Sequence, residues 1–134
     1  MNRTTRAALT LLLSTLSITA TAAGKQINVE FPKGHDHAHY SGSITGYDYD
    51  SYVFRANQGQ RLRLTLDKET VDAMLFGPGI DDAIDLGKYS PALDSQGRYT
   101  LPASGKYQLR ILQSRAEARR HKVKPYRFEL QIDR

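Results

Sequence analysis

The chain has 134 residues, with 19 Lys and Arg against 14 Asp and Glu, and it contains no cysteine. This length fits one ordinary domain, and the lack of cysteine excludes a disulfide framework and a lipid-bearing cysteine. The net charge of +5 is too small to indicate a nucleic-acid-binding protein.

The first residues have the pattern of a secretory signal peptide. Arg3 and Arg6 give a positive start, residues 7–18 form an apolar run, and small residues follow up to Ala23. The run is too short to span a bilayer as a helix. We therefore expect cleavage near Ala22 or Ala23, with a periplasmic product that has no membrane anchor. Residues 24–134 are then a single domain of 111 residues with a net charge of +3.

Along this domain, short segments alternate apolar and polar residues, the pattern of strands that bury one face. In 61–66, leucines alternate with Arg61 and Arg63, and 126–132 repeats the pattern with Tyr126, Phe128 and Leu130. The spacing predicts an all-β fold, a single antiparallel β-sandwich of about eight short strands. The predicted strands cover 26–31, 40–46, 51–56, 61–66, 71–76, 99–101, 107–111 and 126–132.

Three segments between these strands stand out. Residues 114–121 are rich in helix-forming residues and begin with Ser114, a good N-cap, so they predict one short helix. Residues 77–97 form a long loop of Gly, Pro, Asp and Ser, and loops of that length are usually functional or disordered. Residues 102–105 are predicted to be a hairpin turn.

The sequence holds candidate residues for a metal site and for an active site. His35, His37 and His39 would project from one face of a strand and could bind zinc or copper, although a flexible polar segment explains them more simply. Calcium binding or general acid–base chemistry is an option for the loop acids, but their spacing is irregular and Asx turns explain them more simply. Since the sequence has no nucleophile elbow or phosphate-binding loop, we expect no enzyme activity, no metal and no cofactor. The loop acids are Asp48, Asp50, Asp81, Asp82 and Asp85.

The helix and a nearby turn favour a binding role. Arg115 and Arg119 share one helix face, where their like charges repel, while Glu117 can pair only with Arg120 or His121. Two unpaired guanidiniums suit an anionic partner, although a solvated helix face is an equally simple explanation. Tyr47, in the turn Tyr47–Asp50, is out of register with the inward residues of the next strand and can serve as an exposed anchor.

Taken together, these segments resemble the periplasmic inhibitors of goose-type (g-type) lysozyme. A broader likeness, in Tyr52, Phe54 and Gly59-Gln60, is to β-sandwich modules appended to secreted enzymes. The segments that carry the specific resemblance are 40–42, 46–50, 75–82, 89–91, 93–95 and 101–107, the last reading Leu-Pro-Ala-Ser-Gly-Lys-Tyr.

The resemblance implies a protein that binds a g-type lysozyme and protects peptidoglycan, with no obligatory small-molecule ligand. Ser104 and Lys106 would offer donors from the turn tip, Gly105 would permit the turn, and Tyr107 would support it. The sequence leaves open whether the turn tip or the helix enters the lysozyme cleft. The lysozyme-binding set is completed by two arginines that pair with carboxylates and by two residues that line the contact. These are Arg115, Arg119, Tyr47 and Asp48.

Two other functions remain open from the sequence. A β-sandwich with exposed Tyr and Asp can bind glycans such as peptidoglycan, although the chain has no Trp and we expect it to stand alone rather than as part of an enzyme. Metal buffering through the three histidines would be lost on addition of a chelator.

Overall fold

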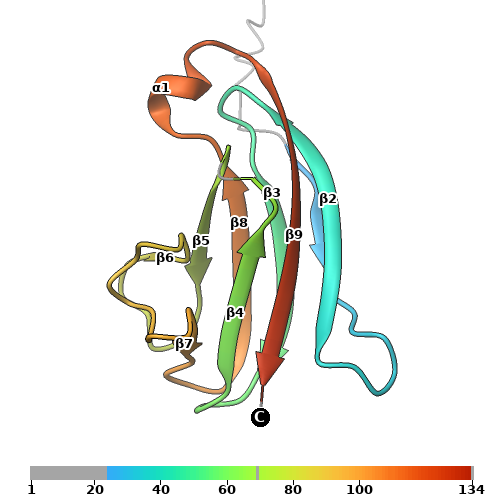
Figure 1. Ribbon diagram of the computed structural model, residues 1–134, viewed down its shortest axis with the longest axis vertical. Helices are drawn as coiled ribbons and strands as arrows, with labels where there is room; N and C mark the ends of the chain where they lie inside the picture. Colours follow the sequence, from blue (N-terminus) through green and yellow to red (C-terminus); the bar gives the residue numbers. More distant parts are fainter. Residues whose placement is uncertain (1–23, 69, 134) are drawn as a thin grey trace, which may run out of the picture.

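The computed structural model describes residues 24–68 and 70–133, which form two packed β-sheets (Figure 1). This confirms the predicted sandwich. The expected signal peptide, residues 1–23, lies outside the described residues. Within the described part of the chain, no helix is long and apolar enough to cross a membrane.

One sheet has the strand order β1-β3-β8-β5-β6 and the other the order β2-β9-β4-β7. Neighbouring strands are antiparallel, except that β1 and β3 run parallel. The strands are β1 Gln26–Asn28, β2 His37–Thr45, β3 Asp50–Ala56, β4 Arg61–Leu66, β5 Asp72–Phe76, β6 Ile84–Asp85, β7 Tyr99–Thr100, β8 Gly105–Leu112 and β9 Val123–Asp133, and the helix is α1 Arg115–Ala118.

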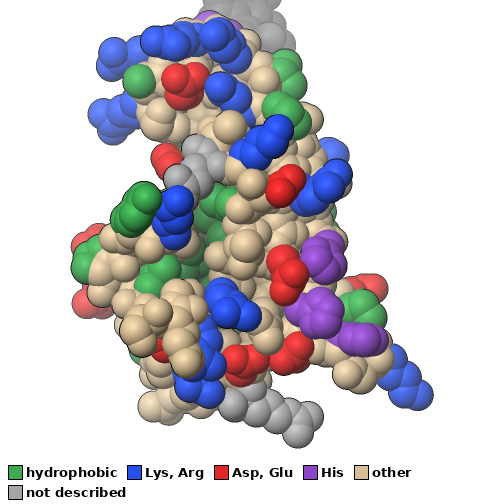
Figure 2. Space-filling model, in the orientation of Figure 1, with side chains coloured by type: hydrophobic (Ala, Val, Ile, Leu, Met, Phe, Trp, Pro, Cys, Tyr) green, Lys and Arg blue, Asp and Glu red, His purple; other side chains and the backbone are tan. Residues whose placement is uncertain are grey.

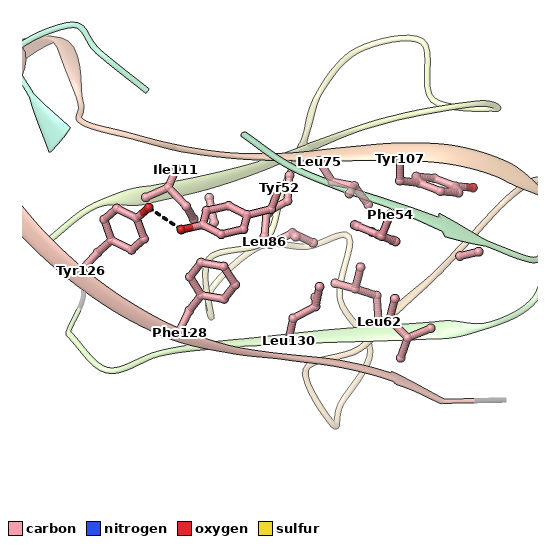
Figure 3. Close-up of a cluster of buried hydrophobic side chains, with 14 of the residues drawn as sticks. Tyr52, Phe54, Leu62, Leu75, Leu86, Tyr107, Ile111, Tyr126, Phe128 and Leu130 are labelled. Carbon is pink, nitrogen blue, oxygen red and sulfur yellow. Dashed lines mark hydrogen bonds between the residues drawn. The ribbon is translucent and has the colours of Figure 1, made fainter. Parts of the chain in front are cut away.

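Alternation along the strands produces the core. In β9, Tyr126, Phe128 and Leu130 are buried while Arg127 is exposed, as the period of two requires. Figure 3 shows these side chains meeting Tyr52 and others from the opposite sheet. Each large side chain that is fully buried in this way contributes about 1.5–3 kcal/mol, so the core holds the two sheets together.

One polar network lies inside the core. The Tyr52 and Tyr126 hydroxyls are 2.6 Å apart (Figure 3), and Tyr126 donates to the carboxylate of Asp50. The backbone N–H of Lys25 donates to the same carboxylate at 2.9 Å. Burial, and then the hydrogen bond to Asp50, raises the pKa of Tyr126. The network is satisfied because both carboxylate oxygens accept a hydrogen bond.

Several strand ends are shifted from the prediction, as in β1, which ends at Asn28 and not at 31, and three further differences concern the helix and the loops. The helix ends at Ala118 rather than at 121, and β6 is a short strand inside the segment predicted to be a long loop. The segment 102–105 is not a hairpin turn, because β7 pairs with β4 in one sheet while β8 pairs with β3 and β5 in the other. It is a crossover between the sheets. The difference arises because alternation marks a strand but not its partner.

Candidate partner-binding site

The candidate site residues fall into two groups at opposite ends of the sandwich. Residues 102–106, here called the crossover tip, end with the first two residues of β8, and α1 follows β8 at the other end (Figure 1). The six residues of β8 that follow the tip separate the two groups by about 20 Å. Ser104, Gly105 and Lys106 therefore lie together at one end, and Arg115, Arg119, Tyr47 and Asp48 at the other.

The crossover tip is held in one conformation by local contacts. The Ser104 hydroxyl oxygen accepts the backbone N–H of Gln58 at 2.8 Å. Gly105 has φ 150°, and a Cβ there would lie 3.0 Å from the Pro78 ring, so the turn requires glycine. Ser104 and Lys106 are both exposed. The tip thus presents a hydroxyl and an ammonium group from a rigid support.

Tyr107 supports the tip from below. Its ring is fully buried and stacks on Phe54 with the centroids 5.7 Å apart. Its hydroxyl donates to the carbonyl of Ala103 at 2.5 Å and accepts the N–H of Ala103 at 3.3 Å. Since no part of Tyr107 is exposed, it cannot touch a partner unless the tip moves. Of the residues predicted to bind lysozyme, Tyr107 therefore supports the tip and does not itself offer a contact surface.

At the helix end, two arginines have no acidic partner among residues 24–68 and 70–133. Ser114 caps α1 by accepting the N–H of Glu117 at 3.4 Å, as predicted. Glu117 lies 3.7 Å from Arg120, a predicted partner, and 3.4 Å from Lys124. Within the described residues, Arg115 and Arg119 form no ion pair and are exposed. Figure 2 shows basic side chains gathered around this end of the molecule.

The turn between β2 and β3 completes the helix end. Tyr47 is 55% exposed, as its register predicted, and the N–H of Asp48 donates to Thr45 at 3.0 Å. Gly46 has φ 57°, and a Cβ there would lie 3.2 Å from a ring nitrogen of His121. The turn and the segment after α1 are therefore in direct contact.

Sequence reasoning missed the residue that joins these two segments. Gln113 is buried, and its side-chain amide donates to the carbonyls of Ile44 at 3.4 Å and Lys122 at 3.1 Å. The N–H of Gly46 also donates to Lys122, at 3.4 Å. One buried amide thus links the end of β2, the end of β8 and the chain after α1. The sequence shows no signal for this, because a lone Gln before a helix is common.

The histidines form a strip on β2 and the loop before it. The ring centroids of His35 and His37 are 5.5 Å apart, and those of His37 and His39 are 5.9 Å apart. His37 lies 3.2 Å from Asp36, and His39 lies 3.6 Å from Glu129. In residues 24–68 and 70–133, no three His, Cys, Asp or Glu side chains are arranged to hold a metal ion.

Comparison with known proteins gives consistent matches. The family described as "Bacterial pre-peptidase C-terminal domain" matches residues 48–113, about half of the chain. A curated protein of Escherichia coli (strain K12), "Inhibitor of g-type lysozyme", is 57% identical over 91% of this chain and 92% of its own length.

Solved structures agree with this match. Two are described as periplasmic lysozyme inhibitors of g-type lysozyme, from Escherichia coli and Salmonella Typhimurium. They are 56% and 54% identical, each with a TM-score of 0.81, and cover 83% of this chain and 100% of theirs. A third such inhibitor, from Aeromonas hydrophila, is 31% identical with a TM-score of 0.67, covering 82% of this chain and 97% of its own.

Proposed function

The chain belongs to the family of periplasmic inhibitors of g-type lysozyme, and from that premise we propose that it binds a g-type lysozyme in the periplasm and blocks its glycan-cleaving cleft. It acts as an inhibitor and not as an enzyme. The relatives favour this function over a glycan-binding module, because those of known name are inhibitors.

The observation that carries the mode of inhibition is the rigidity of the crossover tip. A lysozyme cuts its substrate with at least one carboxylic acid in a long cleft. The tip offers the Lys106 ammonium and the Ser104 hydroxyl to such an acid, from a turn fixed by Tyr107 and Gly105. Because the tip is already ordered, little conformational entropy is lost when it enters the cleft.

The helix end supplies a second contact. The guanidiniums of Arg115 and Arg119 are exposed without acidic partners among the described residues, so each can form a forked hydrogen bond to a carboxylate. Tyr47 adds an exposed aromatic ring beside them. About 20 Å of β8 separates the two ends, so the second contact falls on carboxylates along or outside the cleft rather than on the acid that meets the tip.

A lysis assay on permeabilised cell walls tests the proposal. The protein from residue 24 is added in increasing amounts to goose-type and chicken-type lysozyme in parallel. We expect a stoichiometric loss of goose-type activity that saturates near one inhibitor per enzyme. Unchanged activity of the goose-type enzyme would contradict the proposed function.

Charge reversals separate the two contacts. We expect Lys106→Glu to weaken inhibition at least tenfold, because a second carboxylate would then face the catalytic acid. Arg119→Glu should weaken it by a smaller factor that shrinks as salt is added. Arg127→Glu, an exposed site on the outer face of β9, is the matched control. If Lys106→Glu inhibits as well as this control, the tip does not enter the cleft.

A further inference from the structure

A groove lies on the open side of the sandwich, between β4 and the segment that runs from β5 to residue 91. Its volume is about 450 Å³. Leu64, Leu66, Val71 and Leu86 contribute apolar surface to it. Figure 2 shows apolar side chains in a hollow on this side of the molecule. The groove lies between the two proposed lysozyme contacts and includes no residue of either.

One wall of the groove is an open strand edge. β7 pairs only with Arg61 and Leu62 of β4, and no other described strand lies on that side. The N–H of Asp67 bonds to β9, so in the antiparallel ladder the odd residues of β4 turn their backbone groups toward β9. Leu64 and Leu66 therefore turn theirs toward the groove. Their spacing, about 6.8 Å, is that of successive rungs in a sheet.

The opposite wall carries negative charge and an aromatic ring. Asp72 and Asp85 both line the groove, and burial together with the charge of Asp85 raises the pKa of Asp72. Tyr89 is 85% exposed at the rim, and Lys88 lies beside it with its ammonium 4.9 Å from the centre of the Tyr89 ring. A cation placed between the carboxylates would relieve their repulsion, and the exposed ring offers a flat contact surface.

We propose that this groove binds a short extended peptide segment bearing Lys or Arg, which adds as a strand to β4 at Leu64 and Leu66. The peptide backbone pairs with the open edge, as in strand addition. Alternate side chains then lie over the leucine floor, and a basic side chain reaches Asp72 and Asp85. A sugar fits these features less well, because the backbone N–H and C=O groups of Leu64 and Leu66 match the spacing of another strand's backbone and the groove floor is apolar.

The first experiment uses two blocked pentapeptides, Lys-Val-Lys-Val-Lys and Glu-Val-Glu-Val-Glu, added to the ¹⁵N-labelled protein at low salt. We expect the basic peptide to shift the amide resonances of Leu64, Leu66 and Tyr89, and the acidic peptide to leave them unchanged. Equal binding of both peptides, or shifts confined to residues outside the groove, would overturn the proposal. Larger shifts of the same amides with chitotriose would also overturn it and assign the groove to glycans.

Substitutions in the groove complete the test. Asp72→Asn and Asp85→Asn should each weaken binding of the basic peptide by roughly threefold, the scale of a partly exposed ion pair. Asp81→Asn, an exposed acid of the neighbouring loop that does not line the groove, is the control and should bind as the wild type does. Equal affinity of all three variants would contradict the proposal. Asp85→Asn should also inhibit lysozyme normally, and lost inhibition would show that the groove belongs to the lysozyme interface instead.

Discussion

Tyr107 is fully buried, yet its contacts fix the conformation of the exposed crossover tip. Its hydroxyl fixes Ala103 while its ring packs on Phe54, so the core and the crossover tip share one side chain. A buried hydroxyl contributes through the hydrogen bonds that it keeps, and losing one partner leaves a buried carbonyl unsatisfied. The order of the tip therefore depends on this residue.

We predict that Tyr107→Phe lowers the free energy of unfolding by about 1–3 kcal/mol, because the Ala103 carbonyl loses its donor. Inhibition of the lysozyme should also weaken several-fold, since a looser tip loses more entropy on binding. Urea unfolding and the lysis assay measure the two effects. Tyr99→Phe is the control, because Tyr99 is half-buried and its hydroxyl forms no hydrogen bond within the part of the chain that the structure describes. If the Tyr107→Phe variant inhibits lysozyme as well as the wild type does, Tyr107 does not order the crossover tip for binding.

The tyrosine pair of the core predicts an alkaline dependence of stability. Burial raises the pKa of both Tyr52 and Tyr126 above the usual value of about 10. Their contribution to stability is therefore complete below pH 10. It is lost as the pH rises from there through the folded-state values, because only the unfolded chain ionises readily.

Tyr52→Phe removes one of these groups while keeping the bond from Tyr126 to Asp50. We expect the free energy of unfolding, measured with urea between pH 8 and pH 11, to fall less steeply above pH 10 than in the wild type. If the free energy of unfolding falls equally steeply with pH in both proteins, the buried tyrosine pair is not the source of the alkaline dependence.

At the scale of elements, Gln113 makes the helix end one unit. Its amide holds the carbonyls at the end of β2 and after α1, so the turn with Tyr47 and the helix with its arginines keep a fixed relation. Only Ala118 of α1 is buried. A four-residue helix has little stability of its own, and its position depends on such tertiary bonds.

Gln113→Leu should therefore weaken lysozyme binding through the helix end specifically. The expected result of a double-mutant cycle is that Arg119→Glu costs less affinity in the Gln113→Leu background than in the wild type. Isothermal titration with a goose-type lysozyme measures the four affinities. Additive costs would mean that Gln113 contributes to stability alone.

How far the sequence predicts these elements depends on the physics of each. β4 has the predicted bounds and β9 includes the predicted 126–132, because alternation reports burial directly. The N-cap at Ser114 was also predicted, since capping is local. Strand partners were not, because pairing is long-range. The alternation pattern therefore predicts a hairpin at 102–105, where the structure has a crossover between the sheets. It also does not show that Arg115 and Arg119 lie at the opposite end of the sandwich from this segment.

At the scale of the whole molecule, the sandwich is a rigid spacer between the crossover tip and the helix end, the two proposed contacts. The pairing of β8 with both β3 and β5 places it inside its sheet, so the distance from the tip to α1 is nearly constant. A lysozyme that contacts both ends must therefore meet the inhibitor lengthwise. The resemblance found in the sequence identified the partner, whereas only the fold showed that the candidate residues lie at two ends of the sandwich.

Hydrogen exchange of the complex tests the central claim most directly. The inhibitor and a goose-type lysozyme are mixed at saturating concentration, and amide exchange is followed on both proteins by mass spectrometry. We predict slower exchange in residues 102–106 of the inhibitor together with peptides that line the catalytic cleft of the lysozyme. Unchanged exchange at 102–106, with protection of another surface or of lysozyme segments remote from the cleft, would contradict inhibition by the crossover tip.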